Sequence, residues 1–133
     1  MPLATCTAPA MTVVRPDEET LSRQCLPYFV GVSGVSTPAT GISMNLVIIP
    51  AHGAAEPHFH RGFETAVYMM KGRVDVRFGH DLEELIVLEQ GDFLFIPADM
   101  PHQPVNHDDE PALAIVARND AHEQESVELF HKH

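Results

Sequence analysis

The amino-acid sequence predicts an all-β fold of the small barrel or jelly-roll type. Eleven prolines and eight glycines are scattered along the 133 residues and cut the chain into short segments. Segments rich in apolar and β-branched residues alternate with turn residues, a pattern typical of sandwiches and barrels. Strands of this length need closure or a second sheet to bury one face, so they predict a barrel rather than an open sheet.

We expect strands where alternating or continuous apolar residues are flanked by turns. The clearest are 41–50, which is apolar and closed by proline, and 73–78, where polar and apolar residues alternate. Residues 16–24 are compatible with either a short helix or a turn, because acidic residues follow a proline there. The remaining expected strands are 26–35, 64–70, 84–89, 93–96 and 112–117, with a candidate edge strand at 127–130.

A chain of this length is expected to form one domain, over residues 13–133, preceded by a flexible arm at 1–12. The N-terminus lacks the basic start and apolar run of a signal peptide, and no segment is long and apolar enough to cross a bilayer. Cys6 and Cys25 match no zinc or redox spacing, so no structural disulfide is expected and a cytoplasmic location fits. The net charge of −11 argues against nucleic acid and anionic membranes as partners.

A short polar segment carries the first candidate metal ligands. His58 and His60 are one residue apart, and Glu64 follows four positions later. Because side chains alternate on a strand, both imidazoles point to one face, and Glu64 shares that face if the chain stays extended. Two histidines and a carboxylate suit Mn, Fe, Ni, Cu or Zn. Taken alone, such a histidine pair is also compatible with an ordinary polar strand face.

A second segment, 91–106, supplies a further candidate ligand. It runs from a glycine turn through a short strand and a rigid turn to His102. Pro97 and Pro101 restrict the chain on both sides of Asp99, which can aim His102 at a fixed point. The two segments together predict one metal site.

These segments resemble the two sequence motifs of the cupin superfamily, also called RmlC-like barrels. The resemblance implies a double-stranded β-helix, or cupin jelly-roll barrel, with motif 1 at 53–72 and motif 2 at 91–106. It also implies that one divalent transition metal is held by His58, His60, Glu64 and His102. The motif positions in this chain are Gly53, His58, His60, Glu64 and Gly72, then Gly91, Pro97, Asp99, His102 and Asn106.

The chain departs from the family pattern at three points. Gly53 is one residue too close to the histidines, Glu64 is one residue too far from Gly72, and Asp99 stands where the pattern has glycine. A loop shift and a β-bulge after Glu64 would absorb the first two, and aspartate tolerates a positive φ better than most residues. An alternative register puts Thr65 in the carboxylate position and leaves a three-histidine site.

Other polar residues are candidates for the pocket or the surroundings of the metal. They are Asn45, Tyr68, Gln103 and Asn106. Arg77 and Arg118 are the cations best suited to hold a carboxylate substrate, although a surface position is the commoner one for each. We assign no separate catalytic residue, because no Ser-His-Asp arrangement, phosphate-binding loop or pair of catalytic carboxylates stands out.

The resemblance implies a metal-dependent enzyme that acts on a small organic molecule. Oxygenase chemistry, such as that of a dioxygenase, is favoured over isomerase, decarboxylase or lyase chemistry. The alternative is a non-catalytic cupin that binds or senses a metal or a small ligand. Small cupins commonly form homodimers through edge strands and arms, and the candidates here are 26–35 and the C-terminal tail.

Overall fold

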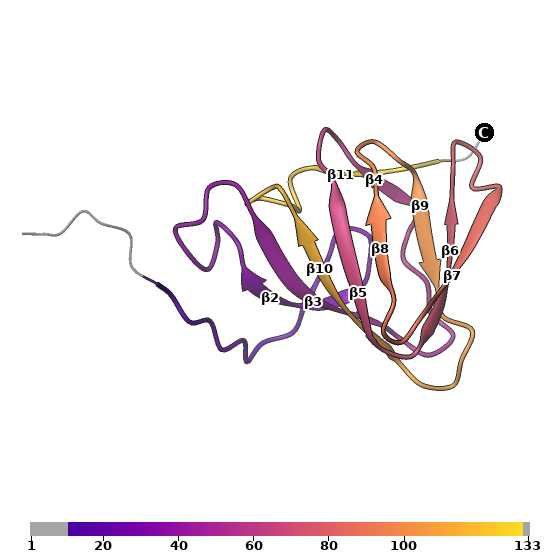
Figure 1. Cartoon of the computed structure of the whole chain (residues 1–133), viewed down its shortest axis with the longest axis horizontal. Helices are drawn as coiled ribbons and strands as arrows, with labels where there is room; N and C mark the ends of the chain where they lie inside the picture. The colour runs from indigo at the N-terminus through magenta and orange to yellow at the C-terminus, as the bar shows by residue number, and fades with distance from the viewer. Residues whose placement is uncertain (1–10, 132–133) are drawn as a thin grey trace, which may run out of the picture.

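The computed structural model describes residues 11–131, which form two antiparallel sheets (Figure 1). The all-β prediction is confirmed, since these residues contain no helix. Accordingly, none of them belongs to a helix with the length and hydropathy of a membrane span. The arm predicted at 1–12 lies outside the described residues except for its last two, as does Cys6.

The six-stranded sheet has the order β1–β2–β3–β10–β5–β8, and the five-stranded sheet has the order β11–β4–β9–β6–β7. The strands of the first are β1 (Thr20–Leu21), β2 (Pro27–Val32), β3 (Ser43–Ile49), β10 (Ala112–Arg118), β5 (Thr65–Lys71) and β8 (Phe93–Ile96). Those of the second are β11 (Val127–Leu129), β4 (His58–His60), β9 (His102–Val105), β6 (Arg73–Phe78) and β7 (Glu84–Glu89).

For residues 16–24, which the sequence left open between a short helix and a turn, the structure has the short strand β1 and a turn. Strand β9 was not predicted, because Pro104 lacks the N–H that a strand usually donates. Pro104 is tolerated in this strand because β4 pairs with β9 only at His58 and His102, while β6 pairs along all of β9.

The hydrophobic core follows the alternation of side chains along β5. Met69 is buried, with 1% of its surface exposed, whereas its neighbour Met70 is 44% exposed. Met69 belongs to a buried apolar cluster between the sheets, formed by Leu26, Ile49, Ala55, Met69, Val74, Val76, Leu88, Ala112 and Ala114. The inner faces of both sheets therefore build one core.

Turns with positive φ direct the chain from one sheet to the other. Gly72 joins β5 to β6 with a φ of 89°, and a Cβ there would lie 3.0 Å from the Cα of Ala112. Glycine is therefore required both for conformation and for space. Asp99 has a φ of 64°, as predicted for this residue in place of the family's glycine. Its carboxylate accepts a hydrogen bond from the Gly62 N–H at 2.9 Å, which ties the two motif turns together.

We expect the two adjacent methionines of β5 to differ sharply in their contribution to stability. Met69→Ala should lower the free energy of unfolding by about 2–5 kcal/mol, because it opens a cavity in the core. Met70→Ala is the matched control and should change it by only about 0.5 kcal/mol. Urea denaturation of both variants measures the difference, and equal losses would contradict the assignment of strand faces.

Candidate metal centre

Three histidines converge on the inner face of the five-stranded sheet. His58 on β4 pairs directly with His102 on β9, and His60 lies two residues along on the same face. All three are buried, with 3%, 2% and 5% of their surface exposed for His58, His60 and His102 respectively. One ring nitrogen from each lies within 4.8 Å of the other two. The prediction that these three residues meet is therefore matched by the geometry.

Hydrogen bonds hold each ring through its Nδ1 atom. Nδ1 of His58 lies 2.8 Å from the carbonyl oxygen of Glu56, and Nδ1 of His102 lies 2.8 Å from that of Met100. A carbonyl only accepts, so in the neutral rings Nδ1 carries the proton and Nε2 carries the lone pair. Backbone acceptors of this kind fix the tautomer of metal-binding histidines.

The ring of His60 is also held through its Nδ1 atom, but by a side chain rather than by a backbone carbonyl. Nδ1 of His60 lies 3.4 Å from Oγ of Ser126, whose hydroxyl donates to the Glu123 carbonyl at 3.0 Å. The hydroxyl oxygen is thus left to accept from His60. Nε2 of His60 is buried and has no hydrogen-bond partner. A buried lone pair without a partner is costly unless a cation or a donor meets it.

The environment keeps the three imidazoles neutral. Burial lowers the pKa of His58 to about 3, helped by the nearby His102, and lowers the pKa of His102 to about 4. Burial also lowers the pKa of His60, and the positive charge of Arg118 adds to this effect for all three rings. At neutral pH they offer lone pairs rather than protons. Three neutral imidazoles suit Zn, Cu, Fe or Ni, so the group could hold a divalent transition metal.

Glu64, predicted as the fourth ligand, lies outside this group. Its side chain is exposed, while the next residue, Thr65, is 2% exposed and faces the interior. The prediction assumed an extended chain from His60 onward, but Gly62 has a φ of 79° in the turn that separates β4 from β5. That turn shifts the alternation by one residue. The structure thus agrees with the alternative register, in which Thr65 takes the carboxylate position.

A buried ion pair occupies the region where the family pattern has a carboxylate. Nε of Arg118 donates to Oγ1 of Thr65 at 2.8 Å, and the guanidinium lies 3.4 Å from Oε2 of Glu123. Burial lowers the pKa of Arg118 to about 10, which still leaves it charged at neutral pH. Burial raises the pKa of Glu123, against the opposing effects of its hydrogen bond from Gln124 and of Arg118. The guanidinium and the carboxylate thus face each other in the wall of the site.

The other predicted pocket residues divide between the interior and the outside. Asn45 is 5% exposed and lines the cavity, with its Nδ2 atom 3.4 Å from Oε1 of Glu123. Tyr68 points outward and packs against Phe93, with ring centroids 4.7 Å apart, because it shares its face with Glu64. Gln103 donates to the carbonyl of Ala55 at 3.0 Å and does not line the cavity.

The side chain of Asn106 holds backbone groups together and does not line the cavity. Its side-chain amide donates to the carbonyls of Ile49 and Glu110 at 3.0 and 2.8 Å, and its Oδ1 accepts from the N–H of Asp108 at 2.9 Å. These bonds hold the turn after β9. Asn106 therefore supports the strand that carries His102 from outside the cavity.

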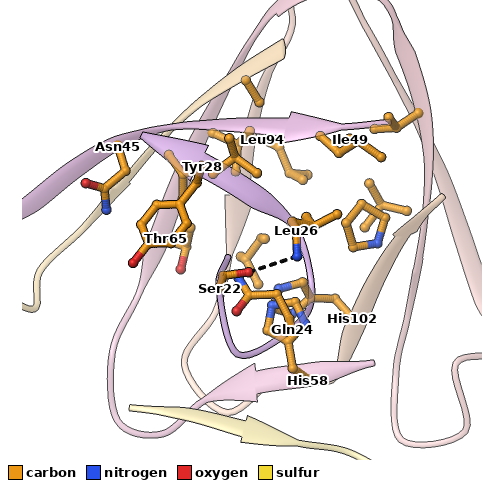
Figure 2. Close-up of a pocket in the computed structure, with 18 of the residues that line it drawn as sticks. Ser22, Gln24, Leu26, Tyr28, Asn45, Ile49, His58, Thr65, Leu94 and His102 are labelled. Atoms are coloured by element: carbon orange, nitrogen blue, oxygen red, sulfur yellow. Dashed lines mark hydrogen bonds between the residues drawn. The ribbon is translucent and has the colours of Figure 1, made fainter. Parts of the chain in front are cut away.

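A cavity of about 80 Å³ lies between the sheets beside the histidines (Figure 2). Its walls are mostly apolar, with Val47, Val67, Met69 and Leu94 among them. Its polar lining comprises Ser22, Gln24, Tyr28, Asn45, His58, Thr65, His102, Arg118, Glu123 and Gln124. An apolar lining with a few convergent polar groups is the usual form of a small-molecule site, but this volume is well below the roughly 300–1,000 Å³ of drug-sized pockets and suits a ligand of only a few heavy atoms.

Several of these polar groups could not be identified from sequence patterns. Arg118 was named as a candidate cation for a carboxylate substrate, with a surface position as the commoner expectation. It is only 8% exposed, and its inward position follows from alternation along β10. Glu123 and Gln24 come from segments outside the two motifs and carry no local signal for a site. Arg77, the other candidate cation, is exposed on β6.

Two facing antiparallel sheets with a buried histidine cluster define an all-β barrel with an internal site. A family model described as the cupin domain matches residues 45–118, more than half of the chain. The chain therefore belongs to the cupin family, as the two motifs predicted. None of the curated proteins compared with this sequence matches it.

Solved structures with the same fold include proteins of differing function. An uncharacterised protein with a double-stranded β-helix domain from Klebsiella pneumoniae has a TM-score of 0.68 at 15% identity, over 90% of this chain and 92% of the other. A Cupin 2 conserved barrel domain protein from Salinispora arenicola has a TM-score of 0.69 at 19% identity, over 87% and 94%. Oxalate decarboxylase from Lactobacillus farciminis, in complex with formate, has a TM-score of 0.71 at 22% identity, over 84% of this chain but 33% of its own. These similarities establish the double-stranded β-helix fold.

Proposed function

We propose that this chain is a metal-dependent cupin enzyme that acts on a small organic acid. The observation that carries the proposal is the convergence of three buried, neutral histidines beside a cavity that also contains a buried arginine. His58, His60 and His102 would hold the metal through Nε2. A divalent transition metal bound there supplies Lewis-acid or redox chemistry, including the oxygen-dependent kind favoured from the sequence.

The charge balance of the cavity favours an anionic ligand. The histidines are neutral, Thr65 replaces a carboxylate, and Arg118 adds positive charge. Glu123 is paired with this guanidinium at 3.4 Å, and a metal held by three neutral imidazoles would leave the site with net positive charge. A carboxylate entering the cavity would compensate the charge of the metal and of the guanidinium. Formate bound to the oxalate decarboxylase of the same fold is an anion of this class.

Glu123 is the group best placed to carry a proton in the proposed reaction. Among the described residues that line the cavity it is the one carboxylate, and burial raises its pKa. Its Oε1 lies 3.4 Å from the amide of Asn45, which can orient it. The apolar walls exclude water and so strengthen the electrostatic interactions inside.

Protein purified without chelators should carry about one transition-metal ion per chain. His60→Ala should lose most of this metal, because it removes one of three convergent lone pairs. Glu64→Ala is the matched control and should keep it, because its carboxylate lies outside the group. Elemental analysis of the three proteins checks this. A wild-type protein that neither contains nor takes up metal would refute the proposed site.

The ligand class can be tested with acetate and its neutral isostere acetamide. Acetate should change the visible spectrum of the Co²⁺-loaded protein saturably, and acetamide should not. Arg118→Lys should weaken the acetate effect roughly tenfold, because lysine lacks the planar fork of donors, while Arg77→Lys should leave it unchanged. Equal responses to acetate and acetamide would contradict the proposal. Binding of organic acids without turnover of any would favour the non-catalytic alternative.

We also propose that the homodimer expected from the sequence forms through the outer face of the six-stranded sheet, in place of the candidate surfaces 26–35 and the C-terminal tail. Phe93 and Phe95 on β8 are 82% and 60% exposed, which is unusual for aromatic side chains. Each phenylalanine ends a row of apolar residues that runs across the strands β3, β10, β5 and β8. One row consists of Met44, Ala117, Ala66 and Phe95, and the other of Leu46, Ile115, Tyr68 and Phe93. A second copy presents the same face, so a two-fold contact would bury both.

Light scattering should therefore give the wild-type protein the mass of two chains. Phe93→Glu should convert it to a monomer, because it places a charge in the apolar contact. Leu85→Glu, on the 51%-exposed Leu85 of the other sheet, should leave the dimer intact. A monomeric wild-type protein, or equal effects of the two variants, would count against this interface.

A further inference from the structure

The segment between β1 and β2 delivers a polar side chain into the cavity. We call residues 22–26 the strap. Its even-numbered residues Ser22, Gln24 and Leu26 are buried and line the cavity, whereas Arg23 and Cys25 are exposed. Figure 2 shows Gln24 at the same end of the cavity as His58 and His102. The strap is thus a wall of the histidine site.

Hydrogen bonds within the strap hold it in a tight loop. The N–H of Ser22 donates to the carbonyl of Leu26 at 2.9 Å, and the N–H of Leu26 donates back to Oγ of Ser22 at 3.0 Å. Cys25 adopts a φ of 66°, and its N–H donates to the carbonyl of Ser22 at 3.0 Å. Such a closed loop leaves Gln24 at its centre with little backbone freedom.

Two further bonds fasten the strap to the site itself. The carbonyl of Gln24 accepts from the N–H of Glu56 at 2.7 Å, and the carbonyl of Glu56 holds Nδ1 of His58. One residue therefore connects the backbone of Gln24 to a histidine ring. On the other side, the N–H of Arg23 donates to Oε1 of Gln124 at 2.7 Å. The position of Gln24 is coupled to that of His58.

The amide oxygen of Gln24 is buried without a partner. The residue is 8% exposed, and Oε1 has no hydrogen bond. Nε2 of His60 is in the same condition. Both atoms are acceptors, so they cannot satisfy one another, and each needs a donor or a cation. A cation is the kind of group that meets both needs.

We propose that Gln24 is the fourth protein ligand of the metal, binding through Oε1 beside the three histidine Nε2 atoms. This inference rests on the proposed function, since it requires a metal at the histidine group. It places the fourth ligand on the N-terminal strap, outside residues 45–118 that match the family model. The carboxylate ligand that is missing at Thr65 is thereby replaced by a ligand from a different part of the chain.

A neutral ligand has a chemical consequence for the site. With an amide oxygen in place of a carboxylate, the protein ligands contribute no negative charge to the metal. The bound ion therefore keeps its full formal charge and attracts an anionic substrate more strongly. An amide oxygen is also a weaker donor than a carboxylate, so an incoming carboxylate competes with it effectively.

Titration of the metal-free protein with Co²⁺ tests the ligand directly. Gln24→Leu keeps the size of the side chain and removes the oxygen, and it should weaken Co²⁺ binding by about tenfold or more, the loss typical of damage to a metal site. The visible absorption bands of the bound Co²⁺ should shift as the ligand set changes. Gln24→Glu should bind Co²⁺ at least as tightly as the wild type, because a carboxylate is a stronger donor.

Gln103→Leu serves as the matched control, because Gln103 adjoins a ligand but does not line the cavity; it should bind Co²⁺ like the wild type. Thermal unfolding of each metal-free variant reports whether the fold is retained. Wild-type affinity and spectrum in Gln24→Leu would overturn this inference and leave the three-histidine site intact. Loss of binding in both Gln24→Leu and Gln24→Glu would also overturn it. Absence of Co²⁺ binding by the wild type would refute the proposed function as well.

Discussion

The hydrogen bonds on Nδ1 of the three histidines are the interactions on which the site depends. Two of them join a ring to the carbonyl two residues earlier in the chain, in Glu56 and in Met100. Such local bonds exist as soon as the strands β4 and β9 form. The direct pairing of His58 with His102 then brings the two local arrangements together. The lone pairs are oriented by the fold itself, so the cost of ordering the ligands is met during folding.

The exchange of a carboxylate for Thr65 changes the electrostatics of the whole cavity. Arg118, which would otherwise face a charged neighbour there, donates to the hydroxyl of Thr65 and pairs with Glu123 instead. A buried ion pair of this kind stabilises little, because desolvation opposes its attraction.

Sequence reasoning was most successful where the signal was local. Turn residues and alternation predicted most of the strands, and the replacement of a family glycine by Asp99 was matched by its positive φ. It was wrong to expect Glu64, just before β5, and Tyr68, on β5, to face the interior. The positions of Glu64 and Tyr68 were counted through a turn at Gly62, and one residue of shift moves every side chain to the opposite face.

The chain's local chemistry is sufficient to specify the cupin barrel, its turns and the three histidines, because each follows from patterns a few residues long. The composition of the cavity around them is a property of the packed sheets. Gln24, Arg118 and Glu123 lie far apart in the chain and line one cavity because the strap before β2, the strand β10 and the segment after β10 are brought alongside the histidine-bearing strands. No local pattern contains that information, since the faces that meet are set by sheet pairing and by the exclusion of water from the core.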